Sequence, residues 1–392
     1  MAACGICHTD LHVMTGHVGA PLPAVLGHEG AGIVAEVGPG VRSVTPGDHV
    51  IPLWRLSCGV CEYCSDGRPA LCDEGMQVRS SGCLLDGSTR FRLDGQAIKH
   101  FCGVSSFSEY CVIPERGVLK IPDDLPLDRA ALLGCAVVSG VGAVFNAARV
   151  RPGSSVAVFG TGGVGLNVVQ GAAIAGAEKI IAVDVLQNKL EWARQFGATH
   201  TVNATTANPV EQVRALTGGK GVHYAFEVIG QPATMRQAYE CLAKRGMAVV
   251  LGVTPMTAEV SVPAMSLVFE ERILTGSIYG AGSPRIEIPK LIDLYRAGKL
   301  KLDELLTRTY PFRQINEAYA ALERGELARG AVTLSPGSHQ RGSCPLMPLR
   351  ASAPPARLAA TQRTGRWPTV RWVPGSGLLT FGLEFVGRFL LP

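Results

Sequence analysis

Long apolar runs are missing from the 392-residue sequence, in which no unbroken stretch reaches the 18 residues that suggest a membrane-spanning helix. The first residues also lack a basic segment followed by an apolar one, so we expect no secretory signal peptide. Charged residues make up only 18% of the chain and hydrophobic residues 47%, which provides material for large cores. These features predict a cytoplasmic protein without a membrane partner, with room for two domains and an appendage.

Cysteine and excess charge are also sparse in most of the chain. Twelve cysteines are too few for a disulfide scaffold, and the tight clustering of four of them points to metal in a reducing compartment. Residues 336–392 carry seven arginines and one glutamate, which accounts for the net charge of +5 and leaves the remainder close to neutral. The body of the chain therefore gives no reason to expect a nucleic-acid partner.

A glycine-rich turn between two strand-like segments is the most informative feature. Residues 156–159 form an apolar run of buried-strand length, and residues 160–165, Gly-Thr-Gly-Gly-Val-Gly, fit G-x-G-x-x-G. A helix is expected over Leu166–Ala175, ended by Gly176, and a second strand over Lys179–Val183. A strand, glycine turn, helix and strand within roughly 30 residues form a βαβ unit that binds a dinucleotide.

The residues of this unit have separate expected roles. Gly160 permits the tight turn, Gly162 lets the backbone approach a pyrophosphate, and Gly165 lets the helix pack closely on the strand. The phosphates would lie on free N–H groups at the helix N-terminus. Asp184, 24 positions after Gly160, is near the spacing of the acid that binds the adenosine ribose hydroxyls. Its charge would repel a 2′-phosphate, so we predict NAD rather than NADP.

Two further groups of residues suggest metal chemistry. The spacing of Cys58, Cys61, Cys64 and Cys72, C-x2-C-x2-C-x7-C, can enclose a tetrahedral structural zinc with no open position. Groups able to bind a metal or transfer a proton also gather near the start, namely Cys7, His8, His12, His28 and Glu29. Short strands over Ile33–Val37 and His49–Ile51, separated by Gly and Pro turns, predict a compact β domain around them.

Alternating strand-like and helix-like segments continue after the glycine turn. Apolar runs at 224–230, 247–252 and 273–278, with a helix expected over Pro232–Ala243, indicate a parallel doubly wound sheet. A helix over Val137–Val150 is expected to lead into this sheet, and helices over Pro289–Gly298 and Ile315–Gly325 to follow it.

The order and spacing of the motifs resemble the zinc-dependent medium-chain alcohol dehydrogenases, of the longer type that includes the class I and class III enzymes. The resemblance runs from about Cys4 to Leu334 and is carried by residues 5–10 (GICHTD), 27–32 (GHEGAG), 46–50 (PGDHV) and the glycine fingerprint. It implies an α/β protein with a GroES-like β catalytic domain, residues 1–136 and 280–335, and a Rossmann NAD-binding domain, residues 137–279.

The resemblance also implies roles for individual residues. Cys7, His28 and Cys135 match the ligands of a catalytic zinc, and the cysteine cluster matches the structural zinc lobe. Thr9 and His12 match a proton relay, and Asp10 and Glu29 match residues beside the metal ligands. Substrate-pocket aromatics match Trp54 and Phe101. The cofactor contacts match His8, Gly160, Gly162, Gly163, Val164, Gly165, Asp184, Lys189 and Arg329.

Three departures from the family pattern stand out. Some tens of residues usually precede the GICHTD motif, so the first strands of the catalytic domain are expected to be missing, with unpaired edges and exposed core as the result. Met76 stands where a glutathione-binding arginine is expected. The resemblance stops before residues 336–392, whose Pro, Ser, Ala, Gly and Arg content predicts disorder.

The sequence therefore predicts an enzyme that interconverts an alcohol with an aldehyde or ketone, using NAD and two zinc ions per chain. An S-(hydroxymethyl)glutathione (formaldehyde) dehydrogenase, a relative that holds NAD permanently, and a non-catalytic truncated zinc- and nucleotide-binding remnant are the alternatives. The resemblance further suggests a homodimer or homotetramer formed through the edge of the Rossmann sheet.

Overall fold

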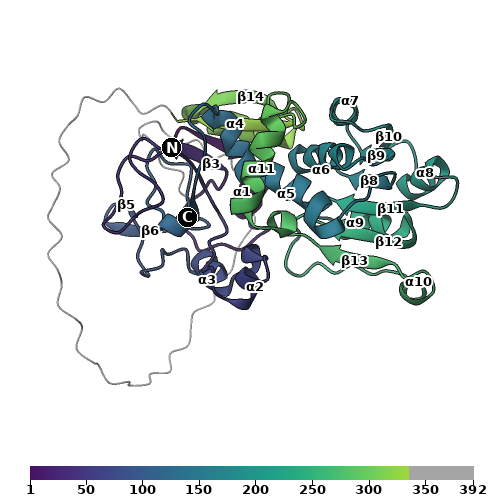
Figure 1. The fold of residues 1–392 in the computed structure, drawn as a ribbon, viewed down its shortest axis with the longest axis horizontal. Coiled ribbons are helices and arrows are strands. Elements are labelled where there is room, and N and C mark those ends of the chain that lie inside the picture. The colour runs from purple at the N-terminus through teal and green to yellow at the C-terminus, as the bar shows by residue number, and fades with distance from the viewer. Residues whose placement is uncertain (335–392) are drawn as a thin grey trace, which may run out of the picture. The chain divides into compact units, whose positions relative to one another are not determined.

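The computed structural model describes residues 1–334, which contain two six-stranded sheets and one small sheet (Figure 1). The first six-stranded sheet has the order β14 (Leu306–Pro311), β15 (Arg329–Thr333), β1 (Ala3–Ile6), β3 (Gly30–Ile33), β4 (His49–Pro52), β7 (Val118–Lys120). The second has the order β10 (His200–Asn203), β9 (Lys179–Asp184), β8 (Ser155–Phe159), β11 (Val222–Glu227), β12 (Leu242–Val250), β13 (Ile273–Gly276). The small sheet has the order β2 (Ala24–Val25), β6 (Gln96–His100), β5 (Phe91–Leu93).

The second sheet is parallel at every pairing, so the predicted doubly wound sheet is confirmed. Its helices are α6 (Gly163–Ile174), α7 (Gln187–Gln195), α8 (Pro209–Leu216) and α9 (Pro232–Glu240). Val158 of β8 shares a buried cluster with Leu166 of α6, whereas the next residue, Phe159, shares another with Tyr239 of α9. Because successive strand residues point to opposite faces, this alternation shows that helices cover both faces of the sheet.

The glycine turn has the predicted backbone. Gly160 adopts φ +91°, a conformation that other residues rarely adopt, where β8 turns toward α6. A Cβ on Gly165 would lie 1.9 Å from the carbonyl oxygen of Gly160, so a side chain there would force helix and strand apart. A Cβ on Gly162 would have no atom within 4 Å. The helix begins at Gly163, three residues earlier than predicted, because the last two glycines of the motif already belong to its first turn.

A long apolar helical segment precedes the parallel sheet. It comprises α4 (Leu127–Leu132), η3 (Leu133–Val137), α5 (Val138–Gly142) and η4 (Ala143–Ala148), so it begins ten residues before the predicted helix. By length and composition alone Leu127–Ala148 could cross a membrane, which the search for unbroken apolar runs did not detect because Ser139 and Asn146 interrupt it. Its most apolar window is 78% buried within the structure, as expected of a core helix.

Several predicted boundaries are wrong by a few residues. The strand predicted over 33–37 is β3, Gly30–Ile33, and α9 ends before residue 243 because β12 starts at Leu242. The helix predicted to start at Pro289 is α11 (Pro284–Arg296), which has Pro284 in its first turn and Pro289 inside. The last predicted helix is α12 (Ile315–Glu323). The remaining helical elements are α1 (His8–Met14), α2 (Glu62–Ser65), η1 (Pro69–Leu71), α3 (Asp73–Ser81), η2 (Glu115–Gly117), α10 (Ala264–Phe269), η5 (Tyr279–Ala281) and η6 (Phe312–Gln314).

The first strand of the chain lies inside its sheet. β1 pairs with β15 on one side and with β3 on the other, whereas β14 and β7 form the two edges. Exposed apolar side chains are present in the same region, among them Ile33, Tyr110 and Val112. The predicted domain boundaries and missing strands stay predictions, and the predicted disordered tail lies outside the described residues.

Candidate active site

Two sulfurs and an imidazole from distant parts of the chain meet in the interior. Cys7 lies between β1 and α1, His28 between β2 and β3, and Cys135 on the long helical segment. Together with Glu29, their ligand atoms all lie within 4.8 Å of one another, and all four residues are buried. Thiolate and imidazole donors suit zinc, and three such ligands leave a fourth position open for water or substrate. The structure thus brings together the three residues predicted to hold a catalytic metal.

Asp10 orients the imidazole of this cluster. Its Oδ2 lies 2.9 Å from Nδ1 of His28, and its Oδ1 accepts a hydrogen bond from the backbone N–H of Gly27 at 2.9 Å. Both residues are almost completely buried. A carboxylate at Nδ1 fixes the tautomer of a metal-binding histidine and leaves Nε2 free for the metal. This geometry agrees with the position predicted for Asp10 beside the metal ligands.

Glu29 faces the cluster and also a buried arginine. Its Oε1 lies 3.8 Å from Nε2 of His28 and accepts a hydrogen bond from the Arg329 guanidinium. Burial raises the pKa of Glu29 to about 8, although the charge of Arg329 opposes the rise. The predicted neighbour of the metal and the predicted cofactor-binding arginine therefore form one buried pair, which the sequence did not suggest.

The two predicted relay residues lie on the same short helix. Thr9 and His12 are three positions apart on α1, so they share a face, but no hydrogen bond joins them in the described part of the chain. The His12 ring lies 6.2 Å from the His8 ring and 5.7 Å from the His17 ring, measured between centres. Desolvation, with the charge of His17, lowers the pKa of His12 below its ordinary value. A neutral imidazole at this position can accept a proton.

The four-cysteine lobe has the geometry of a closed metal site. The sulfurs of Cys58, Cys61, Cys64 and Cys72 lie within 4.8 Å of one another. Backbone N–H groups of Val60 and Cys61 point at the Cys58 sulfur and lower the pKa of that thiol to about 6, which favours the thiolate. Four thiolates leave no open coordination position, so this lobe suits a structural zinc.

Predicted cofactor residues surround the glycine turn. A Cβ on Gly163 would lie 2.6 Å from Cδ of Arg329, so the arginine crosses the N-terminus of α6. Desolvation and the charges of Arg329 and Lys189 lower the pKa of His8 to about 4, so its ring is neutral at pH 7. Val164 is half-buried in the first turn of α6. These cations and helix N–H groups can hold a pyrophosphate.

Asp184 lies at the end of β9, as predicted, but its carboxylate already has partners. Oδ2 accepts hydrogen bonds from the backbone N–H of Thr161 at 2.7 Å and from its hydroxyl at 3.0 Å. Oδ1 accepts from the backbone N–H groups of Val185 and Leu186. The carboxylate therefore closes the glycine turn in addition to any contact with a ribose.

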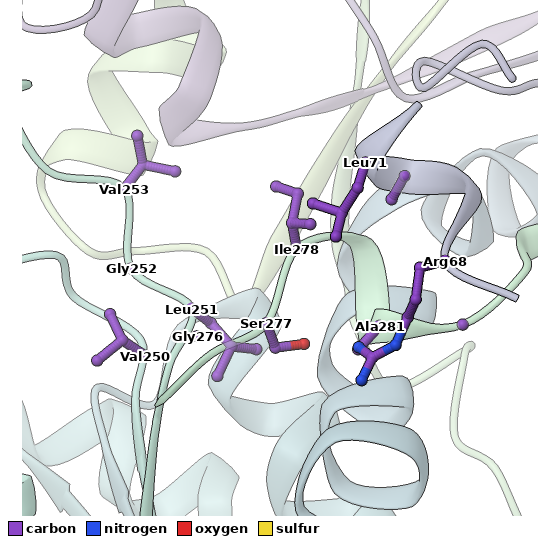
Figure 2. A pocket seen from close by; sticks show the side chains of 12 residues that line it. Arg68, Leu71, Val250, Leu251, Gly252, Val253, Gly276, Ser277, Ile278 and Ala281 are labelled. Atoms are coloured by element: carbon purple, nitrogen blue, oxygen red, sulfur yellow. The ribbon is translucent and has the colours of Figure 1, made fainter. Parts of the chain in front are cut away.

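Two aromatic rings lie next to the metal-ligand cluster, and a pocket lies at the ends of two strands of the parallel sheet. The rings of Trp54 and Phe101 approach His28 edge-on, with centres 5.7 and 5.9 Å away. A pocket of about 420 Å³ opens where β12 and β13 end (Figure 2). Its lining comes from the ends of these strands and from the cysteine lobe, and comprises Arg68, Ala70, Leu71, Val250, Leu251, Gly252, Val253, Gly276, Ser277, Ile278, Ala281 and Gly282. Ligands in parallel α/β folds bind outside the carboxyl ends of strands. The position of this pocket therefore favours the binding of a cofactor or substrate in it.

Some of these features were missed in the sequence. Val253 follows the predicted strand 247–252 and Ser277 lies near the end of the predicted strand 273–278, so the rule about carboxyl strand ends could have identified them. Tyr279, whose ring centre lies 4.6 Å from that of Trp54, directly follows the predicted strand 273–278 and could have been identified by the same rule. The contact of Arg68 and Leu71 with the pocket depends on how the cysteine lobe folds back.

Comparison with known proteins agrees with this geometry. The family described as "Alcohol dehydrogenase GroES-like domain" matches residues 1–123, and "Zinc-binding dehydrogenase" matches residues 163–297. An "Alcohol dehydrogenase class-3" of Cereibacter sphaeroides is 41% identical over 346 residues, covering 84% of this chain and 90% of the relative. The chain belongs to the zinc-dependent medium-chain alcohol dehydrogenase family. It is therefore an oxidoreductase of the zinc-dependent alcohol dehydrogenase type, with zinc and NAD as its cofactors.

Other relatives of this dehydrogenase support the same assignment. An "S-(hydroxymethyl)glutathione dehydrogenase" of Paracoccus denitrificans is 41% identical over 339 residues, covering 84% of this chain and 90% of the relative. Among solved structures, an "Alcohol dehydrogenase zinc-binding domain protein" from Burkholderia ambifaria has a TM-score of 0.81 at 38% identity. A benzyl alcohol dehydrogenase from Acinetobacter calcoaceticus has a TM-score of 0.80 at 35% identity. Each covers 85% of this chain and 90% of its own, and the predicted GroES-like and Rossmann fold is confirmed.

Proposed function

We propose that this chain oxidises an alcohol to an aldehyde or ketone, or the reverse, at the Cys7–His28–Cys135 cluster. The convergence of these three buried donors from distant segments, within 4.8 Å and with His28 oriented by Asp10, is the observation that supports the proposal. When bound, zinc would polarise the alcohol oxygen and NAD would accept the hydride. The cysteine lobe, Cys58 to Cys72, would hold the second zinc.

The remaining site residues have complementary proposed roles. Thr9 and His12 on α1 would pass the alcohol proton toward solvent. Trp54 and Phe101 would keep the reacting centre dry. Arg329, His8 and Lys189 would hold the pyrophosphate and adenosine ribose end of the cofactor, and Asp184 would favour NAD over NADP by charge repulsion.

The name of the Paracoccus denitrificans relative favours a second candidate, the oxidation of S-(hydroxymethyl)glutathione. Met76, predicted to replace a glutathione-binding arginine, is exposed on α3 and so does not supply a cation itself. Arg79, one helical turn further along α3, is half-buried and could supply one instead.

Steady-state assays separate the candidates. Zinc-loaded protein with NAD and a series of primary alcohols is expected to form NADH, and NADP is expected to be a poorer acceptor. Activity with formaldehyde that depends on glutathione would favour the second candidate. A folded preparation that binds two zinc ions yet shows no turnover would instead support a non-catalytic remnant. NAD that stays bound through gel filtration would indicate a permanently held cofactor.

We also propose that two chains associate through the β13 edge of the Rossmann sheet. Met265, Val268 and Phe269 of α10 and Ile273 of β13 are apolar and at least 44% exposed. An exposed apolar strand edge is unfavourable unless another element covers it. Analytical ultracentrifugation should show a dimer or tetramer that Ile273→Lys dissociates. Burial of the apolar segment Leu127–Ala148 in the core is consistent with the proposed cytoplasmic location.

A further inference from the structure

Arg55 is a buried cation without a counter-charge. The residue is only 8% exposed, yet no carboxylate of residues 1–334 forms an ion pair with it. Its Nε has no hydrogen-bond partner in that range, and its Nη1 contacts the Met76 sulfur at 3.9 Å. A desolvated guanidinium is strongly unfavourable unless an anion or a set of acceptors satisfies it.

The other buried arginine side chains of the described chain do have partners. Arg329 is paired with Glu29. Arg272, whose side chain is 8% exposed and whose Cζ lies 5.7 Å from the Tyr239 ring centre, is paired with Glu270. Arg55 shares the burial and the aromatic stacking of Arg272 but lacks its carboxylate.

Arg55 also belongs to a group of donors that lack acceptors. Its Cζ lies 5.0 Å from the centre of the Trp54 ring, and that ring lies 4.6 Å from the Tyr279 ring. The indole Nε1 of Trp54 and the hydroxyl of Tyr279 are buried, and neither has a hydrogen-bond partner in the described structure. Three neighbouring donors without an acceptor indicate a site for an oxyanion.

This group lies beside the candidate active site. The Trp54 ring centre is 5.7 Å from that of His28, so one indole separates the guanidinium from a metal-ligand candidate. Arg79 adds a second cation, because it lies one turn along α3 from Met76, whose sulfur Arg55 contacts. Burial and then the charge of Arg79 lower the pKa of Arg55 to about 10. Within residues 1–334, Arg79 likewise forms no ion pair.

We propose that Arg55, with Trp54, Tyr279 and Arg79, binds the carboxylate of an alcohol whose hydroxyl lies at the Cys7–His28–Cys135 cluster. The inference rests on the proposed dehydrogenase function and narrows its substrate class. Since the two positions are separated by an indole ring, the carboxylate and hydroxyl must be several carbon–carbon bonds of about 1.5 Å apart. A simple hydroxy acid and a glutathione adduct both offer this chemistry.

A matched pair of substrates, 6-hydroxyhexanoate and 1-hexanol, tests the proposal. With zinc and saturating NAD, the KM for the acid is expected to be at least tenfold lower than that for hexanol. Arg55→Gln is expected to raise the KM for the acid at least tenfold more than the KM for hexanol, and Arg55→Lys to restore part of the difference. Arg272→Gln, the control whose side chain is also largely buried, should leave the ratio of the two KM values within twofold.

Binding without turnover gives a second readout. Isothermal titration of the zinc-loaded protein with hexanoate and hexanamide, in the presence of NAD, should show a preference for the acid that Arg55→Gln reduces at least tenfold. If Arg55→Gln does not fold, Arg79→Gln at its half-buried position must show a selective loss of the same kind. Glutathione-dependent oxidation of formaldehyde that is weakened by Arg55→Gln would identify a glutathione adduct as the source of the carboxylate.

Failure of the proposed carboxylate site and failure of the proposed dehydrogenase function would give different results in these experiments. Hexanol turnover without any preference for the acid, or equal losses for both substrates in Arg55→Gln, would overturn the carboxylate site and leave the dehydrogenase function intact. Absence of turnover of either alcohol, with hexanoate binding that still depends on Arg55, would overturn the proposed function and retain the anion site.

Discussion

The guanidinium of Arg329 donates a hydrogen bond to the carboxylate of Glu29, although 300 positions separate the two residues in the sequence. Glu29 immediately follows His28 and precedes β3, whereas Arg329 is the first residue of β15. The same arginine crosses the N-terminus of α6 at Gly163. This pair therefore joins the surroundings of the metal-ligand cluster to the glycine turn.

Removal of either side chain of this pair should destabilise the folded protein. At pH 9, above the raised pKa of Glu29, Glu29→Gln or Arg329→Gln leaves one charge buried and unpaired, so each is expected to lower the free energy of unfolding by about 3–5 kcal/mol. The double variant should lose less than the sum, because no uncompensated charge remains. Urea unfolding of the three variants measures this coupling. Strictly additive losses would show that the two side chains do not interact in solution.

Two glycines of the same turn should respond differently to alanine. In Gly165→Ala the new Cβ meets the Gly160 carbonyl at 1.9 Å, and overpacking of this kind is expected to cost about 1–3 kcal/mol of stability. Gly162→Ala meets no atom within 4 Å and should fold normally, yet bind NADH at least tenfold more weakly because the Cβ occupies the path of the pyrophosphate. Thermal unfolding and NADH fluorescence titration separate the effects. Equal destabilisation of both variants would refute the close-packing explanation.

The two cysteine sites should lose different properties. Cys7→Ala removes a ligand from the site with an open position, so zinc content should fall by one ion and alcohol oxidation should be lost. Cys58→Ala should also remove one zinc but mainly lower the unfolding temperature, because a closed site stabilises its lobe. Zinc analysis, NADH formation and calorimetry on the same preparations test this. Retention of full turnover by Cys7→Ala would contradict the assignment of the catalytic site.

His100 should make stability depend on pH. Burial lowers its pKa from 6.5 to about 4, and its Nε2 accepts a hydrogen bond from the backbone N–H of Arg90, which requires the unprotonated nitrogen. As the pH falls, the unfolded chain binds a proton first, so this contribution is complete above pH 6.5 and is lost between pH 6.5 and 4. The loss amounts to at most about 1.4 kcal/mol per pH unit.

Urea unfolding at pH 7, 6 and 5 measures this slope. The variant His100→Gln should be less stable at pH 7 by about 1 kcal/mol, through the lost hydrogen bond, but should show a shallower decline toward pH 5. His8 and His12 also have lowered pKa values, so some slope should persist in the variant. A slope identical to that of the parent protein would show that His100 does not titrate in this range.

The parallel sheet and its glycine turn could be predicted because their signals are local. An apolar run, three glycines at fixed spacing and an acid at the next strand end each report on contacts between near neighbours, and the strand, turn, helix and strand all exist. The errors at Pro289 and at the long helical segment have a common cause. Composition does not reveal whether a proline such as Pro289 lies in the first turn of a helix or inside it. It also does not reveal whether an apolar helix with charges near its start, such as Leu127–Ala148, is buried in a core.

The sequence by itself determined the α/β fold, the family, and the residue types able to hold two metals and a dinucleotide, because spacing within a few turns or strands decides those. Only the tertiary structure decided which charged and polar groups contact one another. In the folded chain Arg329 donates a hydrogen bond to Glu29, and the backbone N–H of Thr161 donates one to the carboxylate of Asp184. Arg55 lies buried beside Trp54, and its Nε has no hydrogen-bond partner among residues 1–334. These contacts depend on distances and orientations in space, and sequence motifs do not record them, whether the partners are 300 positions apart, as Glu29 and Arg329 are, or close in the chain.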